Sequence, residues 1–543
     1  MSRTSLSRRL RAVRIGNYCD KQNLPRSEGL EQLAHLQAGR SLTRRQFLAD
    51  VGKLASAGAI ATVVNPFSRA FAARSAAPQL SVGIVGAGLA GLACANELSR
   101  NGISAKVFDA ASRVGGRCWS FREFFPGQVA ERGGEFIDTP HKTMLGYVKE
   151  LGLAVEDVDK QPGEVFYYFG GQRYAESTIV DEYRALVPAM RADLRTLSNE
   201  PTALDHTPAD ILLDNVSLSE YLDRRGASRL LTSVITQAYK AEYGLETAEQ
   251  SCLNFLLFIH ADRRSKFTPF GILSDERYHV IDGNDRITEG LSKRLPGQAE
   301  IGMRLVRVVK TSAGKIELTF AQGAATRQIS FDAAVLALPF TTLREVELDA
   351  SLGLPSWKTN AIRSLGYGTN AKMMLGFNSR PWLALGSNGE SYSDLAHHQL
   401  TWETNPTQAS ARRAVLTDYS SGTRGAGLNP ANPQAEAAAF LDDLDDVFPG
   451  ALSAATRDDG GRLRVHLEHW PSNPLIRGSY TCYHPGQFTT IAGYEGQPIG
   501  NLYFAGEHAN SFYEWQGFME GAALSGIQAA REILQAAKVR ILP

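Results

Sequence analysis

A glycine-rich run, VGIVGAGLAGL at residues 82–92, constrains this chain more than any other stretch. The apolar residues that open it predict a buried strand, and residues 89–100 predict a helix. Between them, Gly86, Gly88 and Gly91 have the G-x-G-x-x-G spacing that permits a tight turn and a close approach to a pyrophosphate. The free N–H groups at the helix N-terminus would hold the phosphates. The run therefore predicts a dinucleotide site, with a glycine-rich turn inside a core as the alternative.

The residues after this run indicate which dinucleotide is bound. A second strand is expected over residues 104–108 and ends at Asp109, where such folds hold a ribose hydroxyl. A basic, glycine-rich loop follows with the sequence RVGGR at 113–117, and then GGEFID at 133–138. A loop of this kind can wrap a second phosphate, which favours a large ligand that lies across the domain.

These blocks resemble the FAD-binding fold of the flavin amine oxidases, a family that includes monoamine, polyamine and L-amino acid oxidases. The resemblance continues in NLYFAGE at 501–507 and in EWQGFMEGA at 514–522, where a long helix would face the flavin ring. It implies an α/β fold with a Rossmann-type FAD-binding domain interleaved with an α+β substrate domain. The residues it places at the cofactor are Gly86, Gly88, Ala90, Gly91, Asp109, Ala110, Arg113, Gly116, Arg117, Gly133, Gly134, Glu135, Val306, Gly506, Glu507, Phe518 and Met519.

The length of 543 residues is too great for a single core, and the order of the motifs predicts interleaved domains. The segments assigned to the FAD-binding domain are 80–160, 277–344 and 470–543, and those assigned to the substrate domain are 161–276, which is mostly helical in pattern, and 345–469. Asp282 stands where the family's link back into the flavin domain usually begins with Gly-Gly. Residues 421–435, which are rich in Gly, Asn, Pro and Ala, are expected to form an exposed loop.

The first 79 residues are predicted to be a leader rather than part of the fold. TRRQFL at 43–48 is a twin-arginine pattern, residues 54–68 carry no charge, and AFA at 70–72 has the form of a cleavage site. The uncharged run is too short and too weakly apolar for a membrane span. We therefore expect the twin-arginine export machinery as a partner and a periplasmic or secreted protein. A basic tail with a chance Arg-Arg pair is the alternative.

Charge and cysteine content narrow the partners. Residues 1–72 hold 12 Lys and Arg against 4 Asp and Glu, so the rest of the chain is mildly acidic, which disfavours nucleic acid as a partner. No His or Cys spacing predicts a metal site. Four cysteines remain after the leader, at wide spacing, so disulfide formation stays open, as does the oligomeric state, a homodimer included.

The resemblance also assigns an active site. Lys372, within an apolar strand, matches the lysine that reaches flavin N5 through a water; a lysine that snorkels from a strand edge is the alternative. Tyr480 and Phe518 match the two aromatic residues that flank the substrate amine, and Trp470 extends the match. Ser479 stands where monoamine oxidases carry the cysteine that binds the flavin covalently. We therefore expect non-covalent FAD.

The implied reaction is oxidation of a primary or secondary amine to an imine or aldehyde, with oxygen as the acceptor and hydrogen peroxide as a product. Asp138 matches an acidic position of some polyamine oxidases, and with Glu135 it favours a cationic diamine or polyamine; a helix cap is the other role for Asp138. An L-amino acid oxidase of the same fold, in which Arg263 or Arg264 holds the carboxylate, stays open. A flavin amine dehydrogenase with a periplasmic electron acceptor and a flavoprotein that only binds are further alternatives, and the sequence leaves the exact substrate open.

Overall fold

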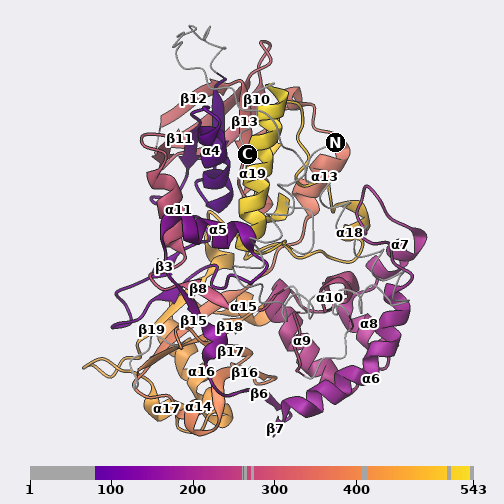
Figure 1. Cartoon of the computed structure of the whole chain (residues 1–543), viewed down its shortest axis with the longest axis vertical. Helices are drawn as coiled ribbons and strands as arrows, with labels where there is room; N and C mark the ends of the chain where they lie inside the picture. Colours follow the sequence, from indigo (N-terminus) through magenta and orange to yellow (C-terminus); the bar gives the residue numbers. More distant parts are fainter. Residues whose placement is uncertain are drawn as a thin grey trace, which may run out of the picture. The chain divides into compact units, whose positions relative to one another are not determined.

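The computed structural model describes residues 80–259, 261, 266–270, 274–323, 325–406, 413–509 and 515–537. The predicted leader at 1–79 lies outside these residues, as do Arg263, Arg264 and Glu514. Residues 80–543 form one compact unit by their internal contacts (Figure 1). Among the described residues, no helix combines the length and the apolar character needed to cross a membrane.

A five-stranded parallel sheet forms the core of the predicted nucleotide-binding part. Its strand order is β20-β13-β1-β2-β9, and every neighbouring pair is parallel. The strands are β1 (Val82–Val85), β2 (Lys106–Asp109), β9 (Ala299–Ile301), β13 (Ala333–Leu336) and β20 (Leu502–Phe504). They come from the three separate segments predicted for FAD binding, so the chain returns twice to complete one sheet (Figure 1). Their carboxyl ends meet at one edge, where open α/β sheets bind ligands.

Two long helices pack against each other beside this sheet. Helix α4 (Leu89–Arg100) begins in the glycine-rich run, and α19 (Met519–Ala536) comes from the C-terminal block (Figure 1). A Cβ atom at Gly526 of α19 would lie 2.0 Å from the carbonyl oxygen of Ala90, so this close approach requires glycine. Helices α5 (Lys142–Leu151) and α11 (Asp285–Lys293) complete this layer. The predicted α/β class is confirmed, and α4 has the predicted bounds.

A four-stranded sheet with the order β12-β11-β10-β14 follows β9 in the chain. Its strands are β10 (Arg304–Lys310), β11 (Ile316–Gln322), β12 (Ala325–Phe331) and β14 (Glu347–Leu348). Strands β10 and β11 pair antiparallel, and β12 pairs antiparallel with the other edge of β11. Most side chains of β12 are exposed, so the strand has no apolar alternation, and its pairing with β11 holds it in the sheet.

A seven-stranded sheet joins the two segments predicted for the substrate domain. Its order is β19-β15-β18-β17-β16-β6-β7. The strands are β6 (Glu164–Phe169), β7 (Gln172–Tyr174), β15 (Ala371–Phe377), β16 (Ser387–Ser393), β17 (Leu400–Glu403), β18 (Ala414–Ser420) and β19 (Val465–His469). Strand β6 pairs in parallel with β16, and every residue of β15 is buried. The division of the chain into domains stays a prediction.

Helices surround this second sheet. The helical segment between β7 and β8 consists of α6 (Glu176–Leu194), α7 (Pro208–Asp214), α8 (Leu218–Arg224), α9 (Arg229–Tyr243) and α10 (Cys252–Ile259). The remaining short elements are β3 (Ser120–Phe121), β4 (Ala130–Glu131), β5 (Val155–Asp157), β8 (Tyr278–Val280), α12 (Phe340–Leu343), α13 (Ser356–Ser364), α14 (Pro381–Ala384), α17 (Ala451–Ala454) and α18 (Gln487–Thr490). The mostly helical pattern of residues 161–276 is confirmed by α6 to α10.

The exposed loop expected over 421–435 is present only at residues 428–432, and the rest of the stretch is mostly helical. Helix α15 (Gly422–Gly427) occupies its first half, and α16 (Pro433–Val447) begins in its second half. Gly425 is buried so closely against neighbouring backbone that a Cβ would lie 2.4 Å from the carbonyl oxygen of Thr369. The side chain of Asn432 accepts a hydrogen bond from the backbone of Ala435 and so caps α16. Gly425 therefore serves tight packing, whereas Gly427 is exposed and has no close neighbour at its Cβ position.

Candidate active site

The turn between β1 and α4 has the geometry of a phosphate site. Gly86 adopts a left-handed φ of 105°, and a Cβ there would lie 2.4 Å from the carbonyl oxygen that follows β13. A Cβ at Gly91 would lie 1.9 Å from the carbonyl oxygen of Gly86, whereas one at Gly88 would meet only the Cα of Gly116, at 3.8 Å. Among the described residues, no side chain caps α4 and its first turn has no acid. Free N–H groups in that turn, which includes Ala90, therefore fit an anionic ligand that approaches over Gly88.

Asp109 lies at the carboxyl end of β2, as predicted, and braces the same turn. Its Oδ2 accepts a hydrogen bond from the backbone N–H of Ala87 at 2.7 Å, and its Oδ1 accepts one from Ala111 at 2.8 Å. Burial raises the pKa of Asp109, and these two N–H donors oppose the rise. A carboxylate has room for further donors, so the arrangement is compatible with a ribose hydroxyl. The ribose contact itself stays a prediction, as does the place of Ala110.

Arg113 shapes the basic loop from inside. Its guanidinium donates hydrogen bonds to the carbonyl oxygens of Val114 and Gly116, and it lies 3.9 Å from the ring centroid of Trp119. Arg132 covers the same indole ring at 3.1 Å. Both guanidiniums therefore hold the loop in shape through the aromatic ring that they share.

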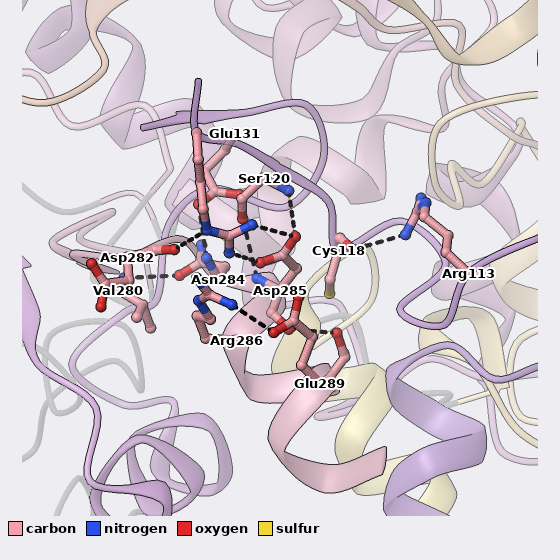
Figure 2. A network of polar contacts seen from close by, with 12 residues as sticks. Arg113, Cys118, Ser120, Glu131, Val280, Asp282, Asn284, Asp285, Arg286 and Glu289 are labelled. Atoms are coloured by element: carbon pink, nitrogen blue, oxygen red, sulfur yellow. Dashed lines mark hydrogen bonds and ion pairs between the residues drawn. The ribbon is translucent and has the colours of Figure 1, made fainter. Parts of the chain in front are cut away.

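A polar network joins this loop to the segment that precedes α11 (Figure 2). Glu131 accepts hydrogen bonds from Ser120 Oγ and from the backbone N–H of Asn284, both at 2.8 Å. The Asn284 amide in turn donates to the carbonyl oxygens of Gly134, at 3.0 Å, and of Glu135, at 2.6 Å. Burial raises the pKa of Glu131 to about 7, although its hydrogen bonds oppose the rise. Asn284 is thus the link that fixes the double-glycine turn, and sequence reasoning did not single it out.

Asp282, which stands where the family usually has the first glycine of a Gly-Gly pair, fits within this network. Gly283 has a φ of 97°, and a Cβ there would lie 2.4 Å from Ser120 Oγ, so glycine is required at this second position. Asp282 contributes its backbone carbonyl oxygen, which accepts a hydrogen bond from Arg122 at 2.8 Å (Figure 2). The first position therefore has no steric need for glycine.

The double-glycine turn brings several predicted site residues together. A Cβ at Gly133 would lie 1.7 Å from the carbonyl oxygen of Arg117, and one at Gly134 would lie 3.0 Å from the Met519 side chain. The indole N–H of Trp470 donates to the carbonyl oxygen of Arg132 at 2.9 Å. The structure therefore places the loop, the turn and the start of α19 in direct contact.

Val306 lies at an irregularity in β10. The pairing of β10 with β11 shifts register between Leu305 and Arg307, so Val306 faces no partner residue there. A backbone released from its ladder at such a bulge can bind a ligand. This position is compatible with the adenine contact that the resemblance implies, which stays a prediction.

Lys372 does not snorkel. It is 5% exposed on β15, and its Nζ donates to Glu135 Oε2 at 2.6 Å and to the carbonyl oxygen of Gly133 at 2.7 Å. The Trp402 indole N–H donates to the other oxygen of Glu135 at 2.9 Å. The Lys372 Nζ also lies within 5.4 Å of the Trp402 ring centroid and 5.8 Å of that of Tyr419. The lysine charge is thus neutralised by Glu135 beside the double-glycine turn.

Tyr480 is fixed at its hydroxyl and along its ring. The hydroxyl donates to the carbonyl oxygen of Ala241 at 2.9 Å and lies 3.0 Å from the Tyr419 hydroxyl. A Cβ at Gly517 would lie 3.5 Å from the Tyr480 ring, so the backbone just before Phe518 packs on that ring. The two predicted aromatic residues therefore come from segments in direct contact.

Glu507 ties these segments together. It is 3% exposed and accepts hydrogen bonds from Arg117 at 3.0 Å, and from Thr481 Oγ and the Gly517 backbone N–H, both at 2.9 Å. Burial opposes ionisation of Glu507, but the charges of Arg117 and His508 and these hydrogen bonds hold its pKa below the usual value. Glu507 follows Gly506, whose φ is 140°. Its carboxylate therefore connects the basic loop to both aromatic segments.

Ser479 offers no thiol, and its hydroxyl donates a hydrogen bond to Asn370 Oδ1. Within the described residues the cysteines are Cys94, Cys118, Cys252 and Cys482, and all four are free and buried. Cys482 is 1% exposed, and burial raises the pKa of its thiol well above the usual value. A buried thiol of this kind is inert.

Asp138 is not a helix cap. Helix α5 begins at Lys142 with His141 at its N-cap position and no capping side chain, so that alternative is wrong. Asp138 is 1% exposed; its Oδ1 accepts from the backbone N–H of Glu276 at 2.7 Å, and its Oδ2 lies 3.2 Å from His141 Nε2. The His141 ring packs against Phe518 with the centroids 5.2 Å apart. Asp138 thus lies beside His141, whose ring packs on Phe518, and burial raises the pKa of Asp138 to about 7.

Two further carboxylates near Tyr480 were missed. Glu242 follows the residue that accepts the Tyr480 hydroxyl, and burial and the Asp138 charge raise its pKa to about 8. Burial, then the charges of Glu242 and Asp138, raises the pKa of Glu276 well above the usual value. Both residues are partly exposed, and within the described chain neither carboxylate has a hydrogen bond or an ion pair. No motif surrounds them, and only the fold brings them together.

Comparison with known proteins agrees with this geometry. Residues 89–534 match a family model described as flavin-containing amine oxidoreductase. The chain is 25% identical over 478 residues to "Lysine-specific histone demethylase 1 homolog 2" of Oryza sativa subsp. japonica, covering 85% of this chain but only 58% of that protein. It is 21% identical over 483 residues to the L-amino-acid oxidase of Naja atra, covering 84% of this chain and 88% of the relative.

A solved structure shares the fold. The cyclohexylamine oxidase from Brevibacterium oxydans IH-35A superposes with a TM-score of 0.72 at 20% identity, covering 85% of this chain and all of that one. The relatives thus include proteins named for amines and proteins named for amino acids, so the choice between these substrates depends on the residues of the site.

Proposed function

Because the chain belongs to the flavin-containing amine oxidoreductase family, we propose that it is an exported amine oxidase whose substrate carries a second cationic group, such as a diamine or polyamine. As a member of that family, it is a flavin-dependent oxidoreductase that acts on CH–NH2 or CH–NH groups. The products are an imine, which hydrolyses to an aldehyde, and hydrogen peroxide. The twin-arginine pattern at 43–48 supports export.

The cofactor in this proposal is FAD, held without a covalent bond. The open approach over Gly88, the free N-terminus of α4 and the bulge at Val306 fit the two halves of such a dinucleotide. When bound, the flavin accepts the hydride from the carbon that bears the amine. The residues of the protein bind and orient the substrate and exclude water from the site. Tyr480 presents a fixed aromatic face, and the packed wall formed by His141 and Phe518 excludes water.

The charge balance around Tyr480 carries the proposal. Lys372 is paired with Glu135, so its charge is not available to a substrate carboxylate. Burial raises the pKa values of Glu242, Glu276 and Asp138, and the charge of Asp138 adds to the rise at Glu242 and at Glu276. A substrate cation beside these carboxylates would favour their ionised forms, whereas a substrate carboxylate would add to the repulsion. The site is therefore better suited to a substrate with two cationic groups than to a neutral L-amino acid.

The contacts of Asp138, Glu242 and Glu276 assign each of them a role. Asp138 is fully buried and already holds the backbone of Glu276, so in this proposal it positions its neighbour. Glu242 and Glu276 keep exposed surface and unpaired oxygens, so they meet the distal ammonium. A charge-assisted hydrogen bond to such a cation contributes about 1.5–3 kcal/mol.

The proposal is tested by peroxide formation in air. The panel contains 1,4-diaminobutane, spermidine, 1-aminobutane, L-leucine and L-glutamate, each as the sole substrate of the purified flavoprotein. We expect 1,4-diaminobutane or spermidine to give the highest kcat/KM. A higher value for L-leucine or L-glutamate would instead support the L-amino acid oxidase alternative. Reduction of an artificial electron acceptor without peroxide would indicate a dehydrogenase.

A further inference from the structure

A buried polar chain lies outside the residues assigned to the substrate and the cofactor. The Tyr483 hydroxyl donates to Glu495 Oε1 and accepts from Gln516 Nε2 at 2.7 Å. Glu495 Oε2 accepts from the backbone N–H of Gly493 at 2.8 Å. Tyr483, Glu495 and Gln516 are 2%, 0% and 8% exposed, so water does not compete for these bonds. One hydroxyl thus satisfies a carboxylate and an amide from two different segments.

A buried lysine, Lys358, lies beside this network of hydrogen bonds. It is 0% exposed on α13, and its Nζ donates to the backbone carbonyl oxygens of Tyr494 and Glu495 and lies 4.0 Å from the ring centroid of Phe504. Burial raises the pKa of Glu495 and lowers that of Lys358, each to about 7. The two backbone carbonyl oxygens offset part of the cost of burying the lysine, and they tie α13 to the segment that carries Glu495.

This network of buried hydrogen bonds ends at Gln516, two residues before Phe518 of the active site. Gln516 is the residue before Gly517, and Gly517 adopts a left-handed φ of 83°, a conformation that favours glycine. Two tethers hold this segment next to Tyr480. One is the bond from Gln516 to Tyr483, and the other is the bond from the Gly517 N–H to Glu507, which also holds Thr481.

The two tethers act on neighbouring residues just before Phe518. The Glu507 tether fixes the N–H of Gly517, but it does not hold the side chain of Gln516. The Tyr483 tether fixes that side chain and therefore the direction in which the segment enters the wall. Tyr483 makes one tether, and Thr481 shares Glu507 with the other, so both tethers connect to the segment directly after Tyr480.

We propose that Glu495 and Tyr483 are positioning residues, which act through Gln516 to set the distance between Phe518 and Tyr480 in front of the flavin. The inference rests on the proposed function only in that these two rings flank the reacting amine. A misplacement of about 1 Å can cost about 100-fold in rate, so the loss of one hydroxyl should be visible in the chemical step.

The test compares two tyrosine-to-phenylalanine variants of the holoenzyme. Tyr483→Phe removes the shared hydroxyl. Tyr221→Phe is the matched control, because Tyr221 is 1% exposed and its hydroxyl also donates to a carboxylate, Asp193 Oδ2 at 2.7 Å, on α8 rather than on the segments that carry Tyr480 and Phe518. We measure the rate of flavin reduction by 1,4-diaminobutane in anaerobic stopped flow, the melting temperature, and the absorption spectrum of the bound flavin without substrate.

We expect Tyr483→Phe to lower the limiting reduction rate at least ten-fold and to change the flavin spectrum, while Tyr221→Phe loses a similar melting temperature and keeps both. Gln516→Leu, which breaks the tether but leaves Tyr483 bonded to Glu495, should reproduce the slow reduction. Glu495→Gln keeps an acceptor for the hydroxyl and should retain most of the rate. If Tyr483→Phe does not fold, Gln516→Leu decides the question.

Reduction rates and flavin spectra equal to wild type in Tyr483→Phe or Gln516→Leu would overturn the proposal and make the chain purely structural. A wild-type enzyme that does not oxidise 1,4-diaminobutane would count against the proposed substrate instead. The spectrum of the substrate-free flavin would then decide on the positioning role, because it does not depend on the substrate.

Discussion

Lys372 and Glu135 lie 237 positions apart in the chain, and their side chains form a buried ion pair with 2.6 Å between Nζ and Oε2. Their side chains are 6% and 2% exposed. The pair lies between the seven-stranded sheet, which contributes the lysine, and the double-glycine turn. It therefore connects the two parts of the site that the chain supplies from distant segments.

Lys372→Met should destabilise the protein and slow catalysis. Removing one partner of a buried pair costs about 3–5 kcal/mol, because the other charge is left without compensation. Glu135→Gln in the same chain should restore part of the melting temperature, but it should not restore the rate. We expect at least a ten-fold loss in flavin reduction or in reoxidation by oxygen, measured separately in stopped flow. Wild-type values for both rates in Lys372→Met would make the lysine structural.

The stability of the protein should depend on pH because the pKa values of Glu242 and Asp138 are raised in the folded state. The pKa of Glu242 is raised to about 8 and that of Asp138 to about 7, so the folded protein holds protons that the unfolded chain has released. Stability therefore falls as pH rises from about 4.5 towards 8, and these two groups contribute fully at the acidic end. Glu242→Gln should flatten the slope of melting temperature against pH in the substrate-free protein. Glu249→Gln, at an exposed carboxylate in the same region, should leave the slope unchanged.

The flavin should be released intact by acid or heat. Ser479 provides no thiol for a thioether, and its hydroxyl is bonded to Asn370. All flavin fluorescence should therefore appear in the supernatant after precipitation. Fluorescence that migrates with the chain on a denaturing gel would contradict non-covalent binding.

Export should depend on the arginine pair. Replacing Arg44 and Arg45 together by lysine should retain the flavoprotein in the cytoplasm with its leader uncleaved. Cell fractionation and the mass of the purified chain measure this directly. Periplasmic delivery of the Lys-Lys variant at the wild-type level would remove the proposed localisation.

Much of the fold could be predicted because its signals are local. The glycine spacing and the apolar run gave α4 its bounds, since sterics at Gly86 and Gly91 admit no other residue. The loop expected over 421–435 failed for the opposite reason. Its glycines look like turn residues, but Gly425 packs closely against the backbone of Thr369.

Site residues that belong to a sequence motif were predicted. Site residues that only the fold brings together were missed. Lys372, Tyr480 and Glu135 were named from their motifs, but the pairing of the first with the third depends on a contact between distant segments. Glu242 and Glu276 lie in stretches without a motif and gain meaning only because the chain brings both beside Tyr480. Burial, which decides the state of these acids, also follows from the tertiary structure.

In the proposed function, unpaired carboxylates beside Tyr480 select a substrate with two cationic groups. The most direct test is the ratio of kcat/KM for 1,4-diaminobutane to that for 1-aminobutane, in wild type and in Glu242→Gln and Glu276→Gln. A lost charge-assisted bond of about 1.5–3 kcal/mol corresponds to about 10- to 100-fold, so we expect each variant to lower the ratio by that factor. Glu249→Gln should keep the wild-type ratio. A wild-type ratio near one, or a ratio unchanged in both variants, would contradict the account.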